Sequence, residues 1–133
     1  MNELHRYRSA LNVLSGASNQ DLSNEFIQYG VINKFFLQCN LAVQLMKALL
    51  TYEGVDSSAS GSPREIIKAS YRYFTFIDEE VWLRMLRDRY DTAHIYDGSK
   101  AIELVHTIIA TYIPTFQQLE EAVVEHYGED FPV

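Results

Sequence analysis

The residues best suited to chemistry lie in one short stretch, positions 89–97. Arg89 offers a planar guanidinium whose donors match phosphate oxygens, and His94 carries an imidazole that can take up and release a proton near neutral pH. Tyr96 and Asp97 add a phenol and a carboxylate. Together these groups are suited to binding a phosphate and moving a proton beside it.

Arg89 and His94 cannot meet on one straight helix. Each residue of an α-helix turns by about 100°, so side chains five positions apart point roughly 140° away from each other. Either the helix ends near His94, or the residues of two subunits meet across a two-fold axis. In both arrangements His94 would exchange the proton and Arg89 would stabilise the charge on the phosphate.

Each of these residues also has a purely structural interpretation. Arg89 can pair with a carboxylate beside it or on another helix. His94 can bind the free carbonyl groups at the end of the preceding helix, and Tyr96 can be a packed ring with its hydroxyl at the surface. We assign Asp97 to capping the next helix rather than to catalysis, because a Gly-Ser pair and a helical pattern follow it.

The elements before this stretch follow a helical pattern. Apolar residues recur at helical spacing along almost the whole chain, with no strand-like alternation between them. We expect a first helix over about residues 2–14. A longer second helix should end at Gly54, which can adopt the left-handed conformation of a helix cap. The small polar residues from Val55 to Gly61 predict a loop.

Two further helices lead into the stretch. Ser62 and Glu65 form a capping box, with Pro63 at the first helical position, so a third helix begins there. Asp78 can cap a fourth helix that leads directly into the stretch 89–97. The residues of the third helix that we expect to face inward are Ile66, Ile67, Ser70, Tyr71 and Phe74.

A long fifth helix should run from Gly98 to Gly128. Its apolar stripe, which includes Ile102, continues on both sides of Pro114, so we expect one kinked helix rather than two. The fold class predicted for residues 1–133 is therefore a single all-α domain, an antiparallel up-and-down bundle of four to five helices. Some helices carry more than one apolar row, which a homodimer or a partner protein would cover.

Composition restricts the function further. The net charge of −7 argues against indiscriminate binding to nucleic acid. The only cysteine, Cys39, lies in an apolar helical pattern, so we expect a buried thiol in a cytoplasmic protein. No apolar stretch is long enough for a membrane span. His5, His106 and His126 are scattered, and no His-Glu spacing indicates a metal site.

Four segments together resemble the nucleotidyltransferase substrate-binding protein family, a branch of the HEPN superfamily related to HepT-like toxins. They are Ile-Asn-Lys-Phe at 32–35, Leu-Met-Lys at 45–47, Ser-Pro-Arg-Glu-Ile-Ile at 62–67 and the stretch 89–97. The resemblance covers most of the chain and keeps the order of the segments.

The resemblance implies a homodimeric bundle that partners a minimal nucleotidyltransferase encoded by the adjacent gene, in a two-gene module of the toxin–antitoxin kind. The chain would hold no cofactor of its own, because ATP or another nucleotide would be used by the partner. In HEPN ribonucleases the positions of Arg89 and His94 cleave RNA without a metal. The position of Tyr96 resembles one that a partner nucleotidyltransferase adenylylates.

Three residues depart from the family pattern. Tyr90 replaces a small polar residue after the motif arginine, and Phe36 and Asn40 replace acidic residues of the second helix. The leading hypothesis is a substrate-binding partner subunit. The alternatives are a metal-independent endoribonuclease toxin that uses Arg89 and His94, and a helical adaptor without activity.

Overall fold

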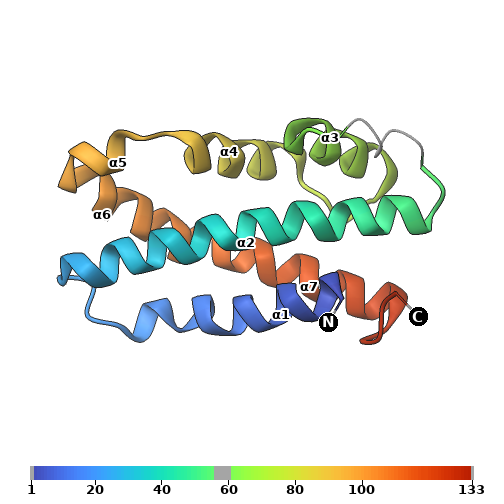
Figure 1. Ribbon diagram of the computed structural model, residues 1–133, viewed down its shortest axis with the longest axis horizontal. Coiled ribbons are helices and arrows are strands. Elements are labelled where there is room, and N and C mark those ends of the chain that lie inside the picture. Colours follow the sequence, from blue (N-terminus) through green and yellow to red (C-terminus); the bar gives the residue numbers. More distant parts are fainter. Residues whose placement is uncertain (1, 56–60, 133) are drawn as a thin grey trace.

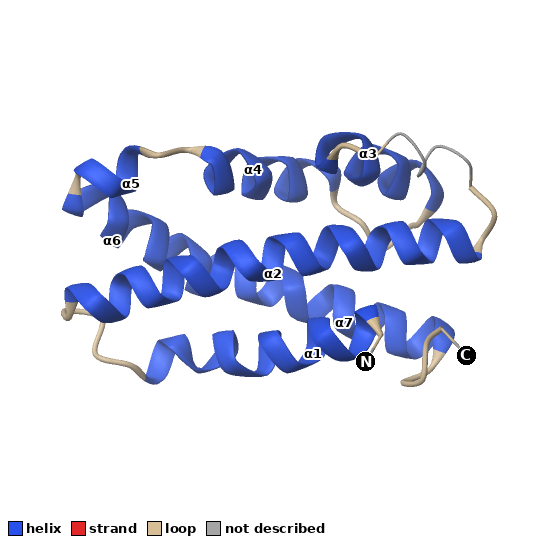
Figure 2. Ribbon diagram, in the orientation of Figure 1, coloured by secondary structure: helices blue, strands red, loops and turns tan. Residues whose placement is uncertain are grey.

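Every regular element in the described part of the chain is helical, as Figure 2 shows. The computed structural model describes residues 2–55 and 61–132. The predicted all-α class is therefore confirmed, while most of the expected loop from Val55 to Gly61 lies outside the described residues. The helices are α1 (Glu3–Leu14), α2 (Glu25–Tyr52), α3 (Pro63–Tyr73), α4 (Glu79–Tyr90), α5 (Ala93–Tyr96), α6 (Gly98–Thr107) and α7 (Ile113–Tyr127), with a 3-10 helix at Ser15–Asn19 and a π-helix at Ile108–Tyr112.

The helices form an antiparallel up-and-down bundle around α2. Figure 1 shows α2 running the length of the molecule, with α1 on one side of it and α3 and α4 end to end on the other. The α6 and α7 helices return behind α2, and α1 packs against both α2 and α7. None of the helices among the described residues is long and apolar enough to cross a membrane.

The caps predicted from the sequence are formed. The Ser62 hydroxyl accepts the backbone N–H of Glu65 at 3.1 Å, which satisfies one of the free donors at the start of α3. Asp78 caps α4 in the same way. Gly54, just beyond α2, has a φ of 75°, as expected for a residue that ends a helix in the left-handed conformation.

Two residues expected to face inward do not. Tyr71 is 50% exposed and Ile102 is 42% exposed. In α3 the buried side consists of Ile66, Ile67, Ala69 and Ser70. Position 71 is turned a further 100° from Ser70, so its ring leaves the core and lies at the rim.

The predicted kink near Pro114 takes the form of a π-helix between α6 and α7. The N–H of Ile113 bonds to the carbonyl of Ile108, five residues earlier. Because Pro114 has no N–H and its ring crowds the preceding turn, the helix widens there and continues instead of ending. Tyr112, in this widened segment, is buried and stacks on Phe35 of α2 with ring centroids 5.3 Å apart.

Candidate functional site

The stretch 89–97 spans the end of α4, a tight turn and the short helix α5. Helix α4 ends at Tyr90, and the Asp91 carboxylate accepts the N–H of Ala93 at 2.9 Å. This turn redirects the chain before His94, which is one of the two arrangements that the sequence left open. The short helix α5 was not predicted, because four residues are too few to produce a periodic pattern.

His94 is held in one orientation. Its side chain is only 7% exposed, and its Nδ1 atom lies 3.0 Å from the backbone carbonyl of Asp91. A carbonyl only accepts hydrogen bonds, so Nδ1 carries the proton and donates it. The imidazole therefore caps the end of α4, which is its structural interpretation. The Nε2 atom keeps a lone pair that can accept a proton.

The backbone of α5 is tied to the bundle by Tyr29. The Tyr29 hydroxyl, on α2, donates to the carbonyl of His94 at 2.8 Å. Its aromatic ring is partly buried against the core. The imidazole is thus supported by α2 through the backbone and by α4 through its own ring. Sequence reasoning did not identify Tyr29, because 65 residues separate the two partners.

Arg89 rests on aromatic rings instead of a carboxylate. Its Cζ atom lies 4.3 Å from the centroid of the Phe36 ring and 5.3 Å from that of Tyr90. Among the described residues no ion pair involves Arg89, and its buried Nε atom has no hydrogen-bond partner. The structural alternative for Arg89, an ion pair with a carboxylate, is therefore not found among the described residues. The charge is stabilised by the negative faces of the rings.

Phe36 is the residue that Arg89 and His94 both contact. The His94 ring meets the Phe36 ring edge-on, with centroids 5.5 Å apart. The sequence singled out Phe36 only as a departure from the family pattern. It could not indicate that this ring would contact both motif residues, because that depends on how α2 lies against α4 and α5.

His94 lines a polar cleft that Arg89 does not line. The cleft has a volume of about 240 Å³ and lies between the end of α4, α5 and α6. Three of its side chains are carboxylates, and one of these, Glu103, lies 3.4 Å from the ammonium of Lys100. The lining residues are Asp88, Asp91, Ala93, His94, Lys100, Glu103, Leu104 and Thr107.

The carboxylate of Asp88 is fixed by Tyr112. The phenol of Tyr112 donates to Asp88. Burial, and then this bond to a carboxylate, raise the pKa of Tyr112 well above its usual value, so the phenol remains a donor. The π-helix that contains Tyr112 thereby orients one wall of the cleft.

Tyr96 and Asp97 have separate positions. Tyr96, at the end of α5, is 87% exposed. Asp97 caps α6, because its carboxylate accepts the N–H and the hydroxyl of Ser99 at 2.9 and 2.6 Å. The hydroxyl and then the backbone N–H of Ser99 lower the pKa of Asp97. The structural role assigned to Asp97 therefore agrees with its contacts.

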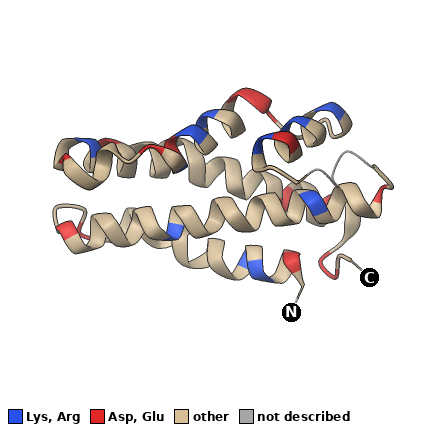
Figure 3. Ribbon diagram, turned by 45° about the horizontal axis from the view of Figure 1, so that its top comes forward, with Lys and Arg blue, Asp and Glu red and all other residues tan. Residues whose placement is uncertain are grey.

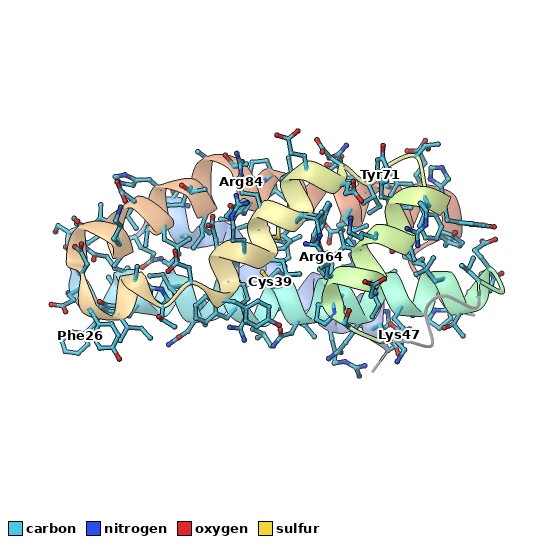
Figure 4. The ribbon with its side chains drawn as sticks, turned by 90° about the horizontal axis from the view of Figure 1, so that it is seen from above. Phe26, Cys39, Lys47, Arg64, Tyr71 and Arg84 are labelled. Atoms are coloured by element: carbon cyan, nitrogen blue, oxygen red, sulfur yellow. The ribbon has the colours of Figure 1, made fainter. Side chains whose placement is uncertain are left out.

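Cys39 lies on α2 beside α4 (Figure 4), and the charge of Arg89 is near enough to act on its thiol. It is a free, buried thiol, as the sequence predicted, and burial raises its pKa. Together with Asn40 and Tyr90, Cys39 lines a second cleft of about 200 Å³. Among residues 2–55 and 61–132 no three His, Cys, Asp or Glu side chains are grouped so that they could hold a metal ion.

A family model agrees with the resemblance found in the sequence. The model described as "nucleotidyltransferase substrate binding protein like" matches residues 2–125. This span includes every helix around the cleft and both motif residues. No curated protein matches the chain.

Proposed function

The chain belongs to the nucleotidyltransferase substrate-binding-protein-like family, and from that premise we propose that it is the substrate-binding partner subunit of a minimal nucleotidyltransferase. The match over residues 2–125 carries this proposal. A cleft lined by a buried imidazole supports it, because a substrate-binding subunit must hold the group that receives the nucleotide.

The proposal is tested on the protein encoded by the adjacent gene, in which we expect Gly-Ser followed by Asp-x-Asp. The two purified proteins should elute as one complex, with a mass by light scattering that equals a whole-number combination of the two chains. An unrelated nucleotidyltransferase of similar size serves as the control. Separate elution at every concentration tested would contradict the proposal.

Within this enzyme His94 would act as the general base. The hydroxyl oxygen of the substrate attacks the α-phosphorus of a nucleoside triphosphate held by the partner, and the bond to pyrophosphate breaks. The hydroxyl proton passes to the Nε2 atom of His94. His94→Ala should then lower the rate of nucleotidyl transfer about 10²- to 10⁴-fold while the complex still forms. An unchanged rate would exclude this role.

The proposed homodimer would use the outer face of α2. Between Glu25 and Glu53 this helix has no carboxylate, and its charged residues are Lys34 and Lys47, as Figure 3 shows. In a chain of net charge −7, two copies can approach there without bringing acidic groups together. Phe26, which is 91% exposed, borders an apolar cleft of about 370 Å³ on this side.

The test of the homodimer is the mass in solution. The natural protein should be a dimer, and Phe26→Ser should shift it toward the monomer, because the exposed ring no longer contributes apolar area. Tyr71→Ser, which removes another exposed ring on α3, should leave the dimer intact. If the natural protein is a monomer, the proposed dimer is refuted. If Phe26→Ser leaves a dimer unchanged, the outer face of α2 is not its interface.

The second candidate function is a metal-independent endoribonuclease toxin. Arg89 favours it, since its guanidinium has no carboxylate partner among the described residues and is free to bind a phosphate. The two motif residues would have to act on one phosphate, with a second copy contributing to the site. To test this function, RNA is incubated with the dimer in the presence of a metal chelator, and its cleavage is measured. Cleavage lost in Arg89→Ala and His94→Ala supports this function, whereas no cleavage by the natural protein favours the adaptor without enzymatic activity.

Tyr96 is the proposed point of adenylylation by the partner. Its 87% exposure leaves the hydroxyl accessible to another active site. Incubation with the partner and ATP should add one adenylate by intact mass, and Tyr96→Phe should abolish the addition. Tyr90→Phe removes another exposed phenol of the same region and serves as the control. An adenylate that Tyr96→Phe retains would place the modification elsewhere.

A further inference from the structure

The charges of the cleft beside His94 indicate what kind of substrate fits it. Resting on the proposed function, we propose that the cleft binds a small alcohol that carries a protonated amine, with the ammonium held by Asp88 and Asp91 and the hydroxyl at the Nε2 atom of His94. The cleft of about 240 Å³ equals the volume of roughly eight water molecules, so it suits a compact molecule.

The lining is negative on both sides of His94. Asp88 comes from the last turn of α4, Asp91 from the turn that follows, and Glu103 from α6. The one cation of the lining, Lys100, lies 3.4 Å from Glu103, so that pair is neutral overall. Neither Asp88 nor Asp91 has an ion pair among the described residues, although the cation of Arg84 lies beside the Tyr112 phenol that donates to Asp88. They leave a net negative site that attracts an ammonium group.

Hydrogen bonds orient these groups for a ligand. The Asp88 carboxylate accepts from the phenol of Tyr112, and Asp91 uses one oxygen for the N–H of Ala93. Each carboxylate keeps further lone pairs for a donor from a ligand. His94 lines the cleft and uses Nδ1 for the carbonyl of Asp91, so Nε2 is the acceptor of its ring that remains for a ligand hydroxyl.

The same geometry disfavours an anion in this cleft. Arg89, the arginine of the stretch 89–97, is stacked on Phe36 and does not line the cleft. A phosphate beside His94 would face three carboxylates with only Lys100 to balance them. An ammonium is therefore the better match.

Three probes built on the same three-carbon chain test the charge preference: diaminopropanol, which has an amine on each side of its hydroxyl, neutral glycerol, and anionic glycerol phosphate. The full-length chain is titrated at constant pH and ionic strength, and the imidazole signals are followed by NMR. The chain has 4 histidines, and a His94→Gln variant assigns the relevant signal. His5, His106 and His126 do not line the cleft and are internal controls.

Diaminopropanol should shift the His94 signal saturably, while glycerol and glycerol phosphate should not. Asp91→Asn keeps the oxygen that caps Ala93 but removes the charge, so binding should weaken about threefold, and Asp88→Asn together with Asp91→Asn about tenfold. Glu121→Gln removes a carboxylate from the exposed side of α7 and should change nothing.

The inference would be overturned by the absence of a saturable shift with diaminopropanol, or by glycerol phosphate as the tighter ligand. Retention of full affinity in the double Asp variant would also overturn it. The assay needs no partner protein, so failure of the inference is distinct from failure of the proposed function. If the nucleotidyltransferase complex forms but the amine does not bind, only the inference is refuted. If the amine binds but no complex forms, only the partner role is refuted.

Discussion

The contact between Arg89 and Phe36 predicts a measurable coupling energy between α4 and α2. A guanidinium over an aromatic ring contributes about 0.5–1 kcal/mol when exposed and about 2 kcal/mol when removed from water. The Cζ atom of Arg89 lies 4.3 Å from the centroid of the ring, and its Nε atom is buried. Because the side chain as a whole is only half-buried, we expect about 1 kcal/mol.

A double-mutant cycle measures this energy. Phe36→Leu removes the aromatic face, Arg89→Met removes the charge and keeps the aliphatic stem, and the double variant closes the cycle. Urea unfolding at constant pH and salt gives the four free energies of unfolding. The double variant should be about 1 kcal/mol more stable than the sum of the single effects predicts, because the contact is lost only once.

A control cycle pairs Phe36→Leu with Arg72→Met, at the far end of α3, where no coupling is expected. Additive effects of Phe36→Leu and Arg89→Met, within about 0.3 kcal/mol, would refute the cation–aromatic contact. The interpretation of Arg89 as a charge held by aromatic rings would then be wrong.

Three further predictions concern single residues. Tyr7→Phe should lower the free energy of unfolding by about 1 kcal/mol, measured in urea, because the buried phenol donates to the carbonyl of Phe116 at 2.7 Å. Cys39 should react with a thiol reagent only in denaturant, since burial raises its pKa; rapid reaction of the native protein would contradict this. Asp97→Ala should destabilise the protein at neutral pH. The pKa of Asp97 is depressed in the folded state, so its contribution is present above the ordinary aspartate pKa and is lost as the pH falls through the folded value. The gap in melting temperature between the natural protein and Asp97→Ala should therefore close in acid, and a constant gap would contradict the capping role.

The sequence predicted the features of the fold that depend on neighbouring residues. Ser62, Asp78 and Asp97 cap helices as expected, because a cap is a contact across two or three positions. One helical run continues past Pro114 as expected, although its π-helical segment was not foreseen. Tyr71 was assigned to the wrong side, since a rim position next to the apolar stripe is ambiguous without knowledge of the neighbouring helix.

The candidate site was predicted less completely, since its contacts join distant segments. Helix geometry gave a turn before His94 as one of two possible arrangements, but it indicated neither the carbonyl of Asp91 as the partner of His94 nor the support from Tyr29. The most important contact that the sequence did not predict is that of Phe36, which lies more than 50 positions before Arg89 and contacts both motif residues. Its role depends on packing between helices, which a single sequence does not specify.

The most direct test of the central claim is the mass of the chain mixed with the nucleotidyltransferase that we propose is encoded by the adjacent gene. If the chain is the substrate-binding subunit, light scattering after gel filtration shows one species that contains both proteins. His94→Ala should form the same species, because the imidazole lines the cleft and its role is chemical. Two separate species, with the masses of the individual proteins, would contradict the claim.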